Sequence, residues 1–212
     1  MNCRQCQGIE EVFSEAYVTK ELKRYRSHGA DKTTRMLINA LKADNIQGMT
    51  LLDIGGGVGA IQHELLAAGL RSATDIDASS AYLAAAKSEA QRRGYSERVT
   101  YQHGNFVDLA ANLMSADIVT LDRVICCYHD MEKLVGLSVA RAGKLYGVVY
   151  PRDTWWMKIG LATQNLIMWL IRNPFRTYVH PTQAVEAVIS SNGFKRRFHR
   201  QTFAWQVAIF AR

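Results

Sequence analysis

The chain has 212 residues, of which 48% are hydrophobic and 21% are charged, with 15 Gly and only 3 Pro. This composition is typical of a globular protein, and it excludes a disordered chain, a collagen-like repeat and a small disulfide-stapled domain. The net charge of +7 comes entirely from residues 151–212, which carry nine basic and two acidic residues, because residues 1–150 carry 17 of each.

Hydrophobic periodicity predicts helices and strands that alternate along most of the chain. An opening helical region is predicted over 9–27, and helices are predicted over 60–68, 80–93, 131–142 and 182–191. A further helix is predicted after Asp31, a possible N-cap, with Met36, Leu37, Ala40 and Leu41 facing inward. Strands are predicted over 50–54, 72–76, 99–103, 116–121, 144–150, 194–199 and 203–210. Apolar strands separated by helices are typical of a mostly parallel sheet covered on both faces. The last two strands are so close in sequence that they favour an antiparallel hairpin.

This order predicts an α/β fold in one domain, residues 1–212. We divide it into an N-terminal helical lid (1–45), a core (46–150), an insertion that could cover a substrate (151–181) and a closing helix and hairpin (182–212). The N-terminus has no basic segment followed by an apolar run, so we expect no secretory signal and a cytoplasmic protein with reduced thiols. Cys3 and Cys6 have the spacing of a zinc-ligand pair, but no second such pair follows, and we expect no metal.

A glycine-rich turn follows the first predicted strand, in the sequence L-L-D-I-G-G-G-V-G-A. Gly55, Gly56, Gly57 and Gly59 would let the backbone bend sharply and approach a ligand closely. No Lys-Ser/Thr follows them, which argues against a triphosphate loop. Asp53, just ahead of the glycines, is poorly suited to a pyrophosphate and well suited to an ammonium group.

Two further signals follow the second and third predicted strands. Asp77 would end the second strand, where a carboxylate can accept hydrogen bonds from both hydroxyls of a ribose; Asp75 is the alternative. Asn105 could hydrogen-bond the edge of an adenine, and Phe106 could pack on its plane.

With these motifs in place, the sequence resembles the class I S-adenosylmethionine-dependent methyltransferases. The resemblance rests on D-I-G-G-G-V-G, I-D-A-S, G-N-F and A-D-I-V-T-L-D-R-V. It implies a Rossmann-like seven-stranded sheet with a C-terminal antiparallel hairpin and S-adenosylmethionine as cofactor. It further implies Asp53 and the glycines near the methionine part, Asp77 on the ribose and Asn105, where the family usually has Asp, near the adenine. Ala78 and Asp122 are further candidates for cofactor binding.

The candidate catalytic residues are His129, Tyr25 and Arg152. His129 is the first candidate for a general base because imidazole titrates near neutrality, although a position at a helix entry beside a capping Asp130 is an equal alternative. Members similar to this chain often have His-His at the positions of Cys126 and Cys127, which are expected here to be small buried residues.

The segment 150–176 is the most distinctive part of the sequence. Its helical pattern is apolar on most sides, which favours burial as a lid over a hydrophobic acceptor, at a dimer interface or at a membrane surface. Its longest apolar stretch is interrupted by polar residues and is too short to predict a membrane span. Basic residues flank it, which favours a partly apolar acceptor with a negative group; these are Arg152, Arg172, Arg176 and His180. A tetrapyrrole carboxylate would fit that description.

We therefore predict methyl transfer to a small molecule, with O-methylation slightly preferred. The enzymatic alternative is an RNA methyltransferase, favoured by the basic C-terminal third; the absence of Asn-Pro-Pro-Tyr and Asp-Pro-Pro-Tyr makes nucleic acid the weaker choice. The non-enzymatic alternative is a cofactor-binding interaction protein. A membrane surface stays open as a partner, and the sequence does not determine the oligomeric state.

Overall fold

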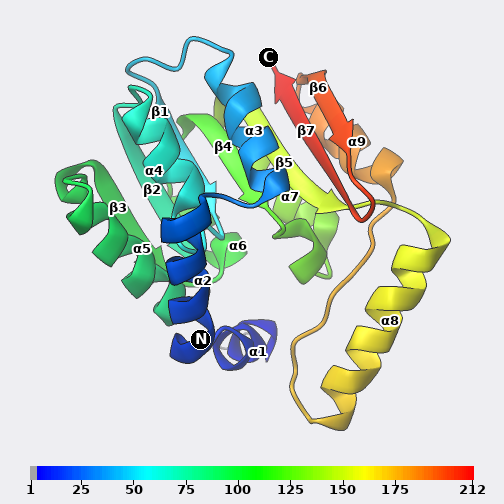
Figure 1. Cartoon of the computed structure of the whole chain (residues 1–212). Helices are drawn as coiled ribbons and strands as arrows, with labels where there is room; N and C mark the ends of the chain where they lie inside the picture. Colours follow the sequence, from blue (N-terminus) through cyan, green and yellow to red (C-terminus); the bar gives the residue numbers. More distant parts are fainter. Residues whose placement is uncertain (1–3) are drawn as a thin grey trace.

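Seven strands form one sheet in the order β3-β2-β1-β4-β5-β7-β6, in a computed structural model that describes residues 4–212 (Figure 1). The strands β1 to β5 are parallel, and β7 runs antiparallel to both of its neighbours, β5 and β6. Their bounds are β1 Thr50–Ile54, β2 Ser72–Asp77, β3 Val99–His103, β4 Ala116–Asp122, β5 Ala142–Pro151, β6 Lys195–Gln201 and β7 Trp205–Ala211. The Rossmann-like sheet with a closing hairpin is therefore confirmed.

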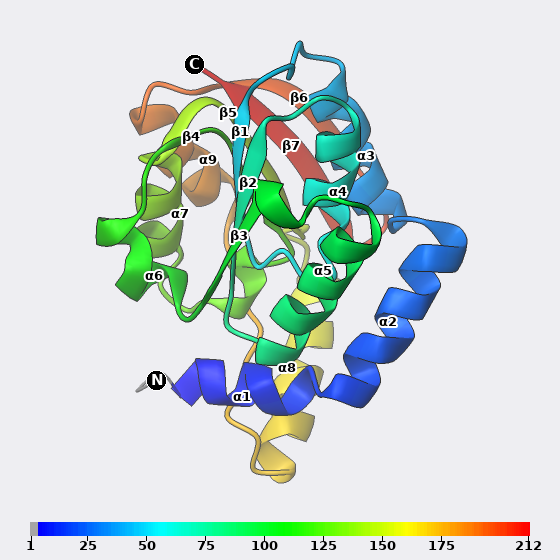
Figure 2. The same ribbon diagram turned by 90° about the vertical axis from the view of Figure 1, so that its left-hand side faces the viewer.

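The helices cover both faces of this sheet, as Figure 2 shows with the sheet seen edge-on. They are α1 Arg4–Val12, α2 Glu15–His28, α3 Lys32–Lys42, α4 Ala60–Ala67, α5 Ser80–Arg92, α6 Phe106–Leu109, α7 Met131–Val139, α8 Trp155–Leu170 and α9 Thr182–Ser191. Two apolar cores result, one on each face. Side chains of α3, α4 and α5 fill one, around Leu37 and Leu65, and side chains of α6, α7 and α9 fill the other, around Leu134 and Ile189.

The sheet places its ligand-binding edge between β1 and β4. From β1 the chain proceeds outward through β2 and β3, then returns to add β4 on the other side of β1. In an open α/β sheet this reversal leaves a crevice beyond the carboxyl ends of the strands, where ligands bind. The glycine turn and the end of β4 both lie at this crevice.

The N-terminal part differs from the sequence prediction. The opening helical region predicted over 9–27 begins earlier, at Arg4, and forms two helices, α1 and α2, separated at Phe13 and Ser14. The break turns the Phe13 ring toward Tyr82 and Phe175, at centroid distances of 5.1 and 6.0 Å. Contacts with distant parts of the chain thus decide the break, and local propensity does not reveal them.

The cap predicted for the next helix is partly wrong, whereas its predicted inner face is confirmed. Asp31 stands at the N-cap position of α3, but its carboxylate makes no capping hydrogen bond and pairs with arginines instead. Leu37 and Leu41 are buried, the half-buried Met36 and Ala40 pack against the same core, and Ile38 is buried there too. Because the Asp31 carboxylate binds two arginines, it does not accept the hydrogen bond from the first turn of α3 that a capping residue would accept.

The insertion forms α8, which lies apart from the layered body and returns through a long extended connection (Figure 1). None of its residues is buried. Its side chains Trp155, Ile159, Leu166 and Trp169 are exposed, so the burial expected for a helix of this apolar character is absent within residues 4–212.

Candidate active site

One cavity of about 510 Å³ opens at the carboxyl ends of β1, β2 and β4. Its floor includes Ile54, Ile76 and Asp122, which end or nearly end those strands. Its walls come from α1, α2 and α8 and from the segment after α8. The volume lies within the usual range for small-molecule sites.

The glycine turn forms one side of this cavity. Gly55 and Gly57 have φ values of 68° and 58°, which L-residues with a side chain rarely adopt. A Cβ on Gly56 would lie 2.6 Å from Oδ1 of Asp75, so the turn closes tightly against β2. These three glycines line the cavity, whereas Gly59 starts α4 at φ 79° and does not line it.

Asp53 lies beneath the turn, almost fully buried and outside the cavity lining. Its Oδ1 accepts a hydrogen bond of 2.7 Å from the Thr120 hydroxyl, and its Oδ2 has no hydrogen-bond partner among the described residues. Burial raises the pKa of this carboxyl to about 7, against the lowering effect of the Thr120 hydrogen bond. A buried carboxylate oxygen without a donor favours a cationic ligand nearby.

Asp77 lines the cavity at the end of β2, and the alternative residue, Asp75, does not. The Asp77 carboxylate accepts backbone hydrogen bonds from Ser79 at 2.8 Å and Gly57 at 3.1 Å. Each oxygen keeps a further lone pair for a ligand hydroxyl. Burial raises the pKa of Asp77 to about 6, which the two N–H groups oppose. Asp75 is buried and accepts from the Gln62 amide instead.

Asn105, Phe106 and Ala78 line the cavity next to Asp77. Asn105 begins α6, and its Oδ1 accepts from the Val107 N–H at 3.2 Å. Its Nδ2 lies 3.1 Å from Asp108 Oδ2. The amide therefore caps a helix, and a ligand would have to share it or displace the Asp108 contact.

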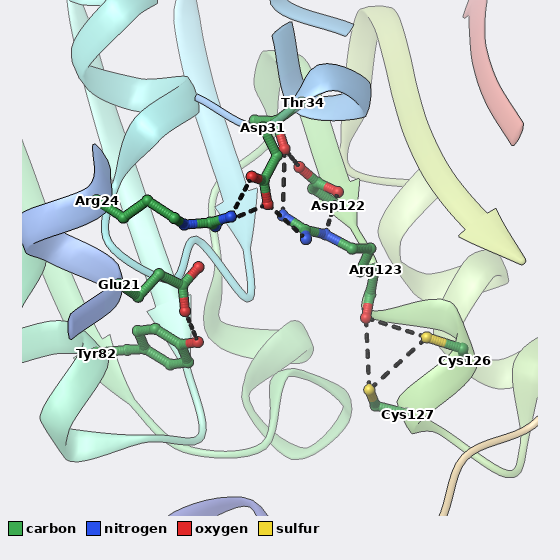
Figure 3. Close-up of polar contacts among 9 residues, drawn as sticks. All are labelled: Glu21, Arg24, Asp31, Thr34, Tyr82, Asp122, Arg123, Cys126 and Cys127. Atoms are coloured by element: carbon green, nitrogen blue, oxygen red, sulfur yellow. Dashed lines mark hydrogen bonds and ion pairs between the residues drawn. The ribbon is translucent and has the colours of Figure 1, made fainter. Parts of the chain in front are cut away.

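A charged network crosses the floor at the end of β4 (Figure 3). Asp122 accepts hydrogen bonds from the Thr34 hydroxyl and from Nε of Arg123, the latter at 3.1 Å. Arg123, at φ 63°, also lies 3.1 Å from Asp31, which pairs with Arg24 of α2 at 2.7 Å. All five line the cavity. Of these, the sequence singled out only Asp122 for the site, because the partners come from separate helices and no local spacing indicates them.

Two more features of the cavity lining were not assigned to the site from the sequence: a hydrogen bond between Tyr82 and Glu21, and the pair of Cys126 and Cys127. The Tyr82 hydroxyl donates a hydrogen bond of 2.5 Å to Glu21 of α2 (Figure 3). Cys126 and Cys127 lie with their sulfur atoms 3.8 Å apart, and each donates to the Arg123 carbonyl. The hydrogen bond with Cys127 and burial raise the pKa of Cys126, which keeps it a thiol.

The structure brings only one of the three catalytic candidates to the cavity. Tyr25 lines it, but its hydroxyl points toward Glu64 at 3.4 Å, and burial raises its pKa. His129 is exposed and stacks on Tyr128 outside the lining, next to Asp130, which caps α7. Arg152 donates to carbonyls of the β6–β7 turn and does not line the cavity either.

The other basic residues that flank α8 lie off the cavity as well. Arg172 is exposed, the Arg176 guanidinium donates to the Asn173 and Phe175 carbonyls, and His180 contacts the Tyr128 carbonyl. Positive charge in the lining comes from Arg24 and Arg123 instead.

Cys3 of the possible zinc pair lies outside the described residues. Cys6 is buried and lines the cavity. Within residues 4–212, His, Cys, Asp and Glu side chains form no group that could hold a metal ion.

Comparisons with known proteins agree with this geometry. Residues 52–148 match the family model of the methyltransferase domain. The magnesium protoporphyrin IX methyltransferase of Synechocystis PCC 6803, solved with S-adenosylhomocysteine, has a similar structure: TM-score 0.75, 19% identity, 98% of this chain and 99% of that one covered. An O-methyltransferase family protein from Burkholderia thailandensis gives a TM-score of 0.68 at 17% identity, with 93% of this chain and 61% of that one covered. A family 2 O-methyltransferase from Planctomyces limnophilus, in complex with apigenin, gives a TM-score of 0.69 at 14% identity, with 94% of this chain and 62% of that one covered. No curated protein sequence matches the chain.

The fold, the glycine turn and the family match together define a methyltransferase domain. The match to the methyltransferase domain covers residues 52–148, and the described chain has the Rossmann-like fold of methyltransferases. The residues present fit S-adenosylmethionine, the cofactor expected from the sequence, because Asp53 holds a buried carboxylate oxygen without a donor among the described residues, and the glycine turn lines the cavity beside Asp77.

Proposed function

We propose that this enzyme methylates an acidic oxygen on a small, partly apolar molecule. One observation carries the proposal: a single cavity joins the cofactor end of the sheet to a wall formed by α1, α8 and the segment after α8. That wall is largely apolar, with Phe13, Leu161 and Phe175 in it, and it also holds the polar Gln164 and Thr177. Such a mixture suits an apolar body with a few polar groups.

The cofactor side follows from the strand ends. Asp77 would accept hydrogen bonds from the ribose hydroxyls, and Gly55 to Gly57 would let the methionine part lie against the backbone. The negative charge of Asp53 behind the turn would favour its ammonium group. Asn105 and Phe106 would contact the adenine. When bound, S-adenosylmethionine supplies a methyl group on a positively charged sulfur.

The protonation of the tyrosines in the cavity lining supports an acceptor atom that is already ionised. No histidine is among the described residues that line it. The pKa values of Tyr25 and Tyr82 are raised, foremost by burial, so neither hydroxyl is ready to accept a proton. An acceptor that is already ionised at neutral pH, such as a carboxylate, needs no base. The guanidinium groups of Arg24 and Arg123 are the positive charges of the lining that would bind it, and to do so they would have to share their contacts with Asp31 and Asp122.

Aromatic side chains of the wall would restrict access of water to an acceptor bound in the cavity. The rings of Phe13 and Phe175 meet at a centroid distance of 6.0 Å and connect the α1–α2 break to the segment after α8. Behind such a wall the acceptor and the methyl group would be held next to each other in a reactive orientation. This positioning is the main contribution that an enzyme makes to a simple displacement reaction.

The distribution of basic residues supports a small acceptor over RNA. Arg196 and Arg197, the centre of the most basic run, lie on β6 and form ion pairs with Glu186 and Asp44. They do not line the cavity. A strip of unpaired positive charge leading to the site, which an RNA substrate would require, is not formed by these residues.

The test is release of S-adenosylhomocysteine from the cofactor with a panel of apolar carboxylic acids, the matched primary amides, protoporphyrin IX and unstructured RNA. We expect turnover with at least one acid and none with its amide. A variant Arg24→Gln should raise KM for the acid more than it lowers kcat, while Lys20→Gln, an exposed residue of the same helix, should leave both unchanged. Turnover with RNA alone would contradict the proposal.

A further inference from the structure

Apolar side chains that face the outside are concentrated on α8. Among residues 4–212, seven of the ten exposed large apolar side chains lie between 155 and 171. We call these seven the α8 patch: Trp155, Ile159, Leu166, Ile167, Trp169, Leu170 and Ile171. Trp155 is 74% exposed and Trp169 64%. Contiguous apolar surface of this kind marks a site of interaction with a partner or a membrane.

The outer side of α8 is more apolar than that of an ordinary surface helix in water. Two of its polar side chains face the protein: Gln164 lines the cavity, and Asn165 accepts a hydrogen bond from the Thr177 N–H at 2.8 Å and donates to the Thr177 carbonyl at 2.7 Å. Six of its large apolar side chains are exposed. A surface helix in water buries its apolar side, so this orientation favours an apolar surrounding on the outer side.

The patch continues onto the tip of the β6–β7 hairpin. Phe203, between the two strands, is 79% exposed, and its ring stacks on Trp156 of α8 at a centroid distance of 4.4 Å. The hairpin and the start of α8 thus present apolar rings at one place on the molecule.

The charges next to this surface are positive. Arg172 directly follows the patch and is exposed, and Arg200, three residues before Phe203 in the chain, is exposed on β6. Neither takes part in an ion pair with another described residue. The one charged residue within α8, Lys158, is neutralised by Asp153 at 2.8 Å, and α8 contains no acidic residue.

We infer that α8 and the hairpin tip dock on an anionic lipid surface, with the α8 patch in the boundary between headgroups and acyl chains. Tryptophan and aliphatic side chains favour that boundary, and arginines beside it bind lipid phosphates. The helix lies on the membrane, because within the described part of the chain no helix is long and apolar enough to cross one. This inference does not depend on which acceptor the enzyme methylates.

Docking would also place the cavity beside the lipid. Leu161 and Gln164 line the cavity from the inner face of α8, while the patch covers its outer face. A lipophilic acceptor dissolved in the membrane would then be separated from the site by one helix.

The experiment is cosedimentation of the full chain with vesicles of phosphatidylcholine alone and vesicles that also contain phosphatidylglycerol. We expect binding to the anionic vesicles that weakens with added salt, much weaker binding to the neutral ones, and a blue shift of tryptophan emission, since three of the four tryptophans lie in α8. No sedimentation with the anionic vesicles, or equal binding to both kinds, overturns the inference.

A paired set of variants assigns the binding to the patch. Leu166→Gln combined with Leu170→Gln should lower vesicle affinity by at least about tenfold. Met114→Gln, at an 89% exposed position away from the patch, should leave it unchanged. Affinity for S-adenosylhomocysteine should be the same in all three proteins, which shows that they are folded. A dimer that dissociates in the double variant, without vesicle binding by the wild type, would assign the patch to a second copy and overturn the inference.

Discussion

The guanidinium of Arg123, directly after β4, lies 3.1 Å from the carboxylate of Asp31, at the start of α3. Arg24 of α2 holds the same carboxylate from the other side at 2.7 Å. The end of β4 is thereby connected through one acid, at the start of α3, to α2 (Figure 3). We expect the position of α2 and α3 over the cavity to depend on this acid.

Asp31→Asn should weaken that connection. We expect the free energy of unfolding to fall by about 1 kcal/mol, since the pairs are partly exposed, and affinity for S-adenosylhomocysteine to fall as well. Urea unfolding and calorimetric titration measure the two effects. Asp44→Asn removes a surface pair with Arg197 far from the cavity and should change neither by a measurable amount.

Asp77→Asn should reduce cofactor binding. Loss of a charged acceptor for the ribose hydroxyls should cost about 1.5–3 kcal/mol of binding free energy, measured by titration with S-adenosylhomocysteine. The control is Asp75→Asn, two residues away, whose side chain is buried against Gln62 and outside the cavity. It should leave the dissociation constant close to the wild-type value. Equal losses in both variants would show that the ribose contact is wrongly assigned.

The buried carboxyl of Asp53 should make stability depend on pH. Burial raises its pKa to about 7 in the folded chain, whereas an exposed Asp in the unfolded chain titrates near 3.9. Between these values the folded state binds more protons than the unfolded state, so this group's contribution falls as pH rises from about 4 to about 7. In Asp53→Asn that decline should be absent. Urea unfolding without cofactor, at about pH 5 and about pH 8, compares the two proteins; parallel pH profiles would contradict this assignment.

Gly8 in α1 permits a close approach to Phe175. A Cβ at this position would lie 2.3 Å from the Phe175 backbone nitrogen, so Gly8→Ala should push α1 away from the segment after α8. We expect a loss of about 1–3 kcal/mol in stability and faster proteolysis near the N-terminus. Gly160→Ala, in open space on α8, should instead gain about 0.5–1 kcal/mol because alanine favours a helix. Similar effects of the two substitutions would contradict the contact.

The sheet and its ligand-binding edge could be predicted from the sequence because their signals are local. The alternation of apolar strands with helices, the glycines after Ile54 and the short link before Trp205 each act within a few residues. Asp77 could be chosen for the same reason, since it directly ends a strand, and the structure places it in the cavity lining and Asp75 outside it.

The amino-acid sequence by itself determined the order of the elements, the sheet and the place of its ligand-binding edge, because period, turn chemistry and strand ends are properties of short segments. Only the tertiary structure decided which polar groups meet. In the folded chain His129 is exposed, the Asp31 carboxylate pairs with two arginines and does not cap α3, and apolar side chains of α8 are exposed. These outcomes depend on contacts between residues far apart in the chain, which a local pattern does not encode.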